Sequence, residues 1–103
     1  MRATLLYIQM VFVWDERKDR INRRKHQISF ETAARVFGDP NAISYIDRVV
    51  ENEERWHTIG SAGGIAVVLL VHTVREEHGE EEIRIISARK ATARERALYD
   101  ASH

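Results

Sequence analysis

Residues 65–74 read IAVVLLVHTV, and this stretch decides how the rest of the chain is arranged. Both alternating sets of its side chains are apolar, which is typical of a strand buried on both faces at the centre of a sheet. The turn signal SAGG at 61–64 precedes it, and the charged segment EEHGEE at 76–81 follows it with Gly79 at the tip. The stretch therefore predicts a central strand joined to its neighbours by tight turns.

Alternation and short apolar runs predict the other strands. Residues 55–60 alternate, with Trp56 and Thr58 on one face and Arg55 and His57 on the other. Further strands are predicted at residues 11–14, 42–46 and 82–89. Strands that follow one another in hairpin order make an antiparallel sheet, here of about four strands.

Three helices complete the pattern. Asp15 is a good N-cap for a helix over 16–26. Ser29 caps a second helix with an apolar stripe, and Gly38 with Pro40 ends it. Thr92-Ala93-Arg94-Glu95 is a capping box that opens a last helix through about residue 101. The sequence therefore predicts an α+β fold with two N-terminal helices and a C-terminal helix, in one domain over residues 1–103.

The first predicted helix is strongly basic although the chain has a formal net charge of zero. Residues 17–26 read RKDRINRRKH, in which six of ten side chains are Lys or Arg and Ile21 is the large apolar one. Trp14 and Ile21 are the expected anchors of this helix to the core. A helix that is polar nearly all round either meets a partner or presents a solvated face.

Composition excludes several kinds of site. The chain has no cysteine, and its five histidines have no spacing typical of zinc ligands, so we expect no disulfide, metal or cofactor. No apolar run reaches the roughly 18–20 residues that a bilayer span requires, and no signal peptide is evident. The expected location is the cytoplasm, without membrane association.

Several phrases, in this order, resemble the BrnT family of bacterial toxins, the ribonuclease half of type II toxin–antitoxin pairs. The similarity runs from Val11 to Tyr99, and the phrases are FVWDERK at 12–18, NRRKHQISFETA at 22–33, FGDP at 37–40, ERWHTIG at 54–60, VHT at 71–73 and RIISARKATARERALY at 84–99.

The resemblance implies a fold of the RelE/ParE type and a metal-independent endoribonuclease that inhibits translation and growth. It implies a partner antitoxin with a ribbon-helix-helix domain, so that DNA is contacted only indirectly, through that antitoxin. The family usually has Gly after the Lys-His pair, where this chain has Gln27. Residues 1–9 precede the family's usual start, so they are read as an N-terminal extension or as an upstream start.

Metal-free RNA cleavage needs a base for the 2′-OH, an acid for the leaving 5′-oxygen and cations for the charged transition state. The candidates for these catalytic roles are Lys25, His26, Glu54, Arg55, His72, Arg84 and Arg89. Contacts to RNA or to the antitoxin are predicted for Arg17, Arg20, Arg24, Arg94 and Arg96.

Each candidate also has a plain structural interpretation. His72 fits a core histidine on the apolar central strand, and Arg89 fits an ion pair beside the last helix. Arg84 and Arg89 differ in strand parity, so they point to opposite faces unless a bulge intervenes. Lys25 and His26 fit a solvated helix end, and Glu54 lies in the acidic run ENEE.

Two other functions stay open at this point. The first is a non-catalytic module that completes a DNA-binding repressor complex with its antitoxin. The second is a degenerate toxin that keeps the fold without the activity. Gln27, in place of the family's Gly, leaves the second alternative open.

Overall fold

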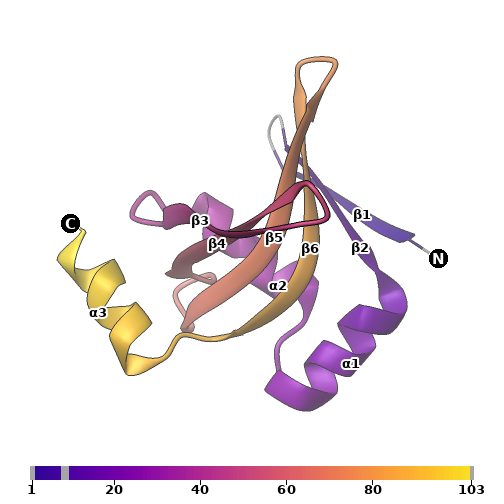
Figure 1. Ribbon diagram of the computed structural model, residues 1–103. Coiled ribbons are helices and arrows are strands. Elements are labelled where there is room, and N and C mark those ends of the chain that lie inside the picture. The colour runs from indigo at the N-terminus through magenta and orange to yellow at the C-terminus, as the bar shows by residue number, and fades with distance from the viewer. Residues whose placement is uncertain (1, 8–9, 103) are drawn as a thin grey trace.

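The computed structural model describes residues 2–7 and 10–102. The predicted extension over residues 1–9 lies partly outside them. The described chain forms a six-stranded sheet in the order β1-β2-β6-β5-β4-β3 (Figure 1). The strands are β1 (Arg2–Tyr7), β2 (Met10–Asp15), β3 (Ile43–Val50), β4 (Glu53–Ser61), β5 (Val67–Glu77) and β6 (Glu80–Lys90). The helices are α1 (Glu16–His26), α2 (Phe30–Ala33), the 3-10 turn η1 (Ala34–Gly38) and α3 (Ala93–Ala101).

The predicted central strand is confirmed. β5 lies inside the sheet and pairs antiparallel with β4 on one side and with β6 on the other. It begins at Val67, two residues later than predicted, because the turn after Ser61 continues to Ile65, whose N–H donates to Ala62 O. The β5–β6 hairpin projects beyond the rest of the sheet (Figure 1), and Gly79 at its tip has a φ of 79°.

The α+β class is confirmed, but the prediction of an antiparallel sheet of about four strands is wrong. The sheet has six strands and is mixed, because β2 pairs parallel with β6. These two strands are not joined by a hairpin: α1, α2, η1 and three strands separate them along the chain. The sixth strand, β1, pairs antiparallel with β2 in a region that was read as an extension.

The second predicted helix is shorter than expected. Ser29 Oγ accepts the N–H of Thr32, as the predicted cap requires. The regular helix ends after one turn and continues as η1, in which Val36 is buried. Two bulky side chains from this segment, Phe30 and Val36, fill the core with Phe12 of β2 and Leu70 of β5.

The two faces of the sheet differ in what covers them. We call the face that packs against α2 and η1 the covered face; it carries Phe12, Leu70 and Ile83. On the other face, which we call the open face, α3 covers one end only, where Tyr99 packs on Ile59 and Leu69. Figure 1 shows α3 and α1 at opposite sides of the molecule.

Asp39, in the FGDP turn, fixes the position of α3. Its Oδ2 accepts hydrogen bonds from the Tyr99 hydroxyl at 2.6 Å and from the N–H of Ser61 at 2.8 Å. The hydrogen bond to Asp39 raises the pKa of Tyr99. Asp39 and Tyr99, which lie far apart in the sequence, are thus joined by one hydrogen bond.

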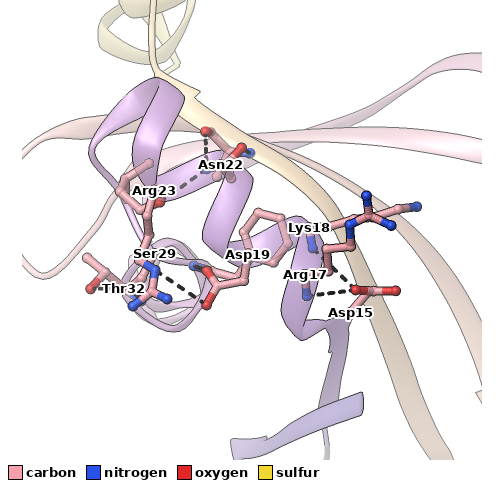
Figure 2. Close-up of polar contacts among 11 residues, drawn as sticks. Asp15, Arg17, Lys18, Asp19, Asn22, Arg23, Ser29 and Thr32 are labelled. Atoms are coloured by element: carbon pink, nitrogen blue, oxygen red, sulfur yellow. Dashed lines mark hydrogen bonds and ion pairs between the residues drawn. The ribbon is translucent and has the colours of Figure 1, made fainter. Parts of the chain in front are cut away.

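Polar side chains hold α1 in place (Figure 2). Asn22 donates to the carbonyls of Ala88 at 2.8 Å and Ile28 at 3.1 Å, and it accepts the N–H of Ala88 at 3.1 Å. Asp19 accepts the N–H of Phe30 at 2.8 Å. The prediction that Ile21 anchors this helix is wrong, because its side chain is 53% exposed.

Asn22 does for β6 what a neighbouring strand would do. β2 pairs with residues 81–84 of β6 and goes no further, so the edge of β6 at Ala88 lies beyond its reach. The amide of Asn22 both donates to and accepts from that one residue, as a paired strand does. A helix with almost no apolar face is therefore attached to the sheet by hydrogen bonds.

Gln27 ends α1 in the left-handed conformation, with a φ of 57° and a ψ of 32°. Its N–H donates to Arg23 O, and its side-chain amide donates to Arg24 O at 3.1 Å. The left-handed turn that usually favours Gly thus forms here with Gln, whose side chain helps to cap the helix. Within the described residues, no helix has the length and apolar character of a membrane span.

Candidate active site

The open face holds a groove of about 590 Å³ where α3 does not cover it. Side chains of the open face from β4, β5 and β6 form much of its floor, and the start of α1 borders it. Its lining residues are Trp14, Asp15, Lys18, Glu53, Arg55, Thr73, Arg75, Glu77, Glu82, Arg84, Ile85 and Ile86.

Glu53 joins two arginines within this groove. Arg84 Nη2 donates a hydrogen bond to Glu53 Oε1, and Arg55 Nη2 lies 3.7 Å from the same oxygen. All three side chains reach solvent, with exposed fractions of 44% for Arg84, 37% for Glu53 and 25% for Arg55. Two guanidinium groups thus converge on one carboxylate oxygen at the position where an anionic ligand can approach.

Two of the residues that line the groove each carry a buried nitrogen donor without an acceptor. Among the described residues, the buried side-chain nitrogens without a hydrogen-bond partner are Trp14 Nε1 and Arg55 Nε. Both residues line the groove. A buried donor without an acceptor costs roughly 1–3 kcal/mol. Of the two residues, Arg55 lies where the arginines meet, whereas the Trp14 ring packs edge-on against Phe30 in the core of the covered face.

A β-bulge decides which way Arg84 and Arg89 point. Val71 pairs with Ser87 and His72 pairs with Ile85, so Ile86 is the extra residue of β6. Ala88 and Ile85 both pack in the core of the covered face although their parity differs. Arg84 and Arg89 consequently both point to the open face, which is the exception that the sequence analysis left open.

Arg89 already has a partner. Its guanidinium donates to both carboxylate oxygens of Glu95 in α3, at 2.7 and 2.9 Å. The hydrogen bond from Arg89 lowers the pKa of Glu95 to about 2, and the same pairing raises the pKa of Arg89. The structure thus places Arg89 in an ion pair between the sheet and α3, outside the lining of the groove.

Glu53 and Lys18 line the groove but were not among the sequence candidates, whereas Glu54 was. Strand alternation puts Glu53 on the same face as Arg55, whereas Glu54 is exposed on the other side. The groove is lined by Glu53 and not by Glu54. Counting in steps of two from Arg55 along β4 would have identified Glu53.

His72 lies on the covered face and is 1% exposed. Its Nε2 is 2.7 Å from Thr58 Oγ1, and its ring packs edge-on against Phe37 at 5.2 Å. Burial lowers its pKa to about 4. The side chain does not line the groove, which lies on the other face of the sheet.

The buried neutral imidazole of His72 predicts a loss of stability in acid. The folded-state pKa lies below the ordinary value of 6.5, so its contribution is complete above pH 6.5 and is lost as the pH falls toward 4. Between pH 7 and pH 4.5 the free energy of unfolding should fall by about 2 kcal/mol from this group. Urea unfolding at both pH values measures it.

His72→Gln is the matched variant, because an amide can hydrogen-bond Thr58 but does not titrate. We expect its unfolding free energy to lack that 2 kcal/mol of acid sensitivity. An equal loss in parent and variant would show that other groups cause the acid destabilisation.

Lys25 and His26 lie at the C-terminal end of α1. Lys18 borders the groove, and Lys25 is seven residues, or about two helical turns, further along. Neither Lys25 nor His26 lines the groove. The other predicted contact residues are exposed on two helices at opposite sides of the molecule (Figure 1): Arg17, Arg20 and Arg24 on α1, and Arg94 and Arg96 on α3.

No group of three or more His, Cys, Asp or Glu side chains in the described part of the chain is arranged to hold a metal ion. The charged groups of the groove are instead four cations, Lys18, Arg55, Arg75 and Arg84, and four carboxylates, Asp15, Glu53, Glu77 and Glu82. This arrangement can bind an anion between guanidinium groups and place a carboxylate beside it.

Comparisons with known proteins agree with this picture of the fold. The model of the family described as "Ribonuclease toxin, BrnT, of type II toxin-antitoxin system" matches residues 14–95. Among solved structures, the crystal structure of the Brucella abortus ribonuclease toxin BrnT is similar, with a TM-score of 0.58 and 23% sequence identity. The match covers 77% of this chain and 92% of that one. No curated protein matches the sequence.

Proposed function

This chain belongs to the BrnT family, the ribonuclease toxins of type II toxin–antitoxin systems, and on that premise we propose that it is an endoribonuclease that cleaves RNA in the open-face groove without a metal ion. The observation that carries the proposal is the convergence of Arg84 and Arg55 on Glu53. These side chains reach solvent and lie on one face of the sheet, on β4 and β6.

The two arginines are proposed to bind the scissile phosphate. A guanidinium group matches the geometry of a phosphate and stabilises the extra negative charge that develops on the phosphorane. A bound phosphate would also compete with Glu53 for Arg84, which frees the carboxylate. The Arg55 Nε has no hydrogen-bond acceptor, so a donor at this place is available to a bound anion.

Glu53 is then the base. It takes the proton of the 2′-OH, the 2′-oxygen attacks phosphorus, and the bond from phosphorus to the 5′-oxygen breaks. The leaving oxygen takes up a proton, for which the Lys18 ammonium is the donor that borders the groove. The products are a 2′,3′-cyclic phosphate and a 5′-hydroxyl.

The basic surface of α1 has a separate role in this proposal. Arg17, Arg20 and Arg24 contact RNA phosphates or an acidic surface of the antitoxin, away from the reacting atoms. A type II system pairs its toxin with a protein antitoxin. We propose that this antitoxin carries a ribbon-helix-helix domain, through which the toxin contacts DNA indirectly. We also propose that the toxin itself has a fold of the RelE/ParE type.

Purified protein tests the metal question. We expect RNA cleavage to persist in excess EDTA, because the proposed reaction uses arginines where a metal-dependent nuclease uses a divalent ion. A separate growth assay tests toxicity: inducing the chain alone in bacteria should arrest growth, and co-expression of its antitoxin should relieve the arrest.

Two results would redirect the proposal. Activity that disappears with EDTA and returns with magnesium would show a metal-dependent reaction. Normal growth with soluble protein and no RNA cleavage would favour the interaction module or the degenerate toxin.

A further inference from the structure

Tyr45 and His57 form an aromatic pair on the open face, outside the lining of the groove. They face each other directly across β3 and β4. Their ring centroids are 5.3 Å apart at 65°, and the Tyr45 hydroxyl lies 3.2 Å from His57 Nδ1. His57 follows Arg55 by two residues on the same face of β4, which is about 7 Å along a strand. The pair therefore lies one step from the arginines of the groove.

The surroundings of the pair hold it rigid. Asp47 Oδ2 is 3.6 Å from His57 Nε2, so both ring nitrogens of His57 have a polar neighbour. Asp47 is itself bonded to Arg48 at 2.7 Å. Tyr45 packs against the apolar cluster of Ile59 and Leu69. A ring that is already fixed loses little conformational freedom when a ligand stacks on it.

Tyr45 also stays neutral. Burial raises the pKa of Tyr45, and the nearby carboxylates of Glu95 and Asp47 raise it further. A neutral phenol does not repel a phosphate backbone, and it presents a half-buried aromatic ring to solvent. The ring packs on the apolar cluster of Ile59, Leu69 and Tyr99, and its remaining surface faces solvent.

We infer that Tyr45 and His57 form a stacking subsite for the base of the nucleotide next to the phosphate held by Arg55 and Arg84. The inference rests on the proposed function and names a single-stranded RNA segment as the substrate. Bases that are free of a duplex stack on aromatic side chains, and this stacking accepts any base because every base has a π-face. The spacing from Arg55 to His57 suits one extended nucleotide.

The same three groups could instead form a proton relay from Asp47 through His57 to Tyr45. That alternative makes a different prediction, because a relay needs the hydroxyl whereas stacking needs the ring. Tyr45→Phe keeps the ring and removes the hydroxyl. Tyr45→Leu removes the ring but keeps an apolar side chain over Ile59 and Leu69, so the apolar packing of this region is preserved.

The test uses a short single-stranded 2′-O-methyl RNA, which cannot be cleaved because its 2′-oxygens carry no proton. Fluorescence anisotropy is measured with the intact strand and with strands that lack one base at successive positions. For the parent, one abasic position should weaken binding about tenfold to a hundredfold. Tyr45→Leu should weaken binding of the intact strand to the same extent, and that abasic position should then cost nothing more.

Ile46→Ala, a control on the same strand with an exposed side chain, should bind and cleave as the parent does. Tyr45→Phe should keep the same loss at the abasic position as the parent, because it keeps the ring. Parent-like binding by Tyr45→Leu would overturn the subsite while leaving RNA cleavage by the parent intact. Loss of cleavage at saturating RNA in Tyr45→Phe would overturn it in favour of the relay. A parent that neither binds nor cleaves RNA would overturn the proposed function and the subsite together.

Discussion

Replacing Asn22 with Leu is expected to lower the free energy of unfolding by about 3–5 kcal/mol, because three backbone groups lose their partner at once. These groups are the N–H and the carbonyl of Ala88 and the carbonyl of Ile28. A buried polar group left unpaired costs roughly 1–3 kcal/mol. A loss of this size is a large part of the total stability of a small domain.

Urea unfolding of the purified variant measures the effect. Arg20→Leu is the matched control, since Arg20 is exposed on the same helix and its replacement should stay within about 0.5 kcal/mol of the parent. A parent-like midpoint for Asn22→Leu would mean that α1 is attached by something other than the Asn22 amide.

Arg84→Ala is expected to lower the single-turnover rate of RNA cleavage at saturating RNA by about 10²–10⁴-fold. Arg84 is the groove cation bonded to Glu53, so its loss removes a charge from the phosphate site and the partner that positions the base. Arg84→Lys should recover only part of the rate, because an ammonium lacks the planar fork of a guanidinium.

Arg24→Ala separates binding from chemistry. Arg24 is exposed on α1 and lies outside the groove lining. Its loss should weaken RNA binding and flatten the salt dependence, with little change in the saturated rate. If Lys25→Ala or His26→Ala abolished the saturated rate while Arg84→Ala did not, the reaction would have to lie at the end of α1.

The starts of the helices were predicted well from the sequence, because a single capping residue sets each of them. Asp15, Ser29 and Thr92 each cap a helix with the side chain that the sequence analysis named. The apolar run around Leu70 became the inner strand β5. These features depend on neighbours along the chain, so they can be read from the chain.

Features that depend on distant segments could not be read in this way. The parallel pairing of β2 with β6 joins residues about seventy positions apart, as Val13 with Arg84 shows. The bulge at Ile86 leaves no mark in the sequence, yet it brings Arg84 and Arg89 to one face. Strands were predicted at 42–46 and 55–60, whereas β3 continues to Val50 past a second irregularity after Ile46, and β4 begins at Glu53 after the tight turn at Glu51 and Asn52.

The candidate site shows the same division. Arg55 and Arg84 were chosen as residues and do lie in one groove. Glu54 was a candidate base although it lies in an acidic run, where strand parity separates it from Glu53. Asn22 looked like one more polar residue of a basic helix, because the backbone groups that it binds lie in β6 and in the turn after α1.

Removal of the attacking 2′-hydroxyl from the substrate tests the proposed cleavage reaction most directly. A short RNA that the parent protein cleaves at one bond is compared with the same strand carrying 2′-deoxyribose at the nucleotide that supplies the attacking oxygen, both in excess EDTA. We predict that the RNA yields a 2′,3′-cyclic phosphate and a 5′-hydroxyl, and that the deoxy strand is not cut at that bond. Cleavage of the deoxy strand at the same rate would contradict 2′-OH attack in the open-face groove.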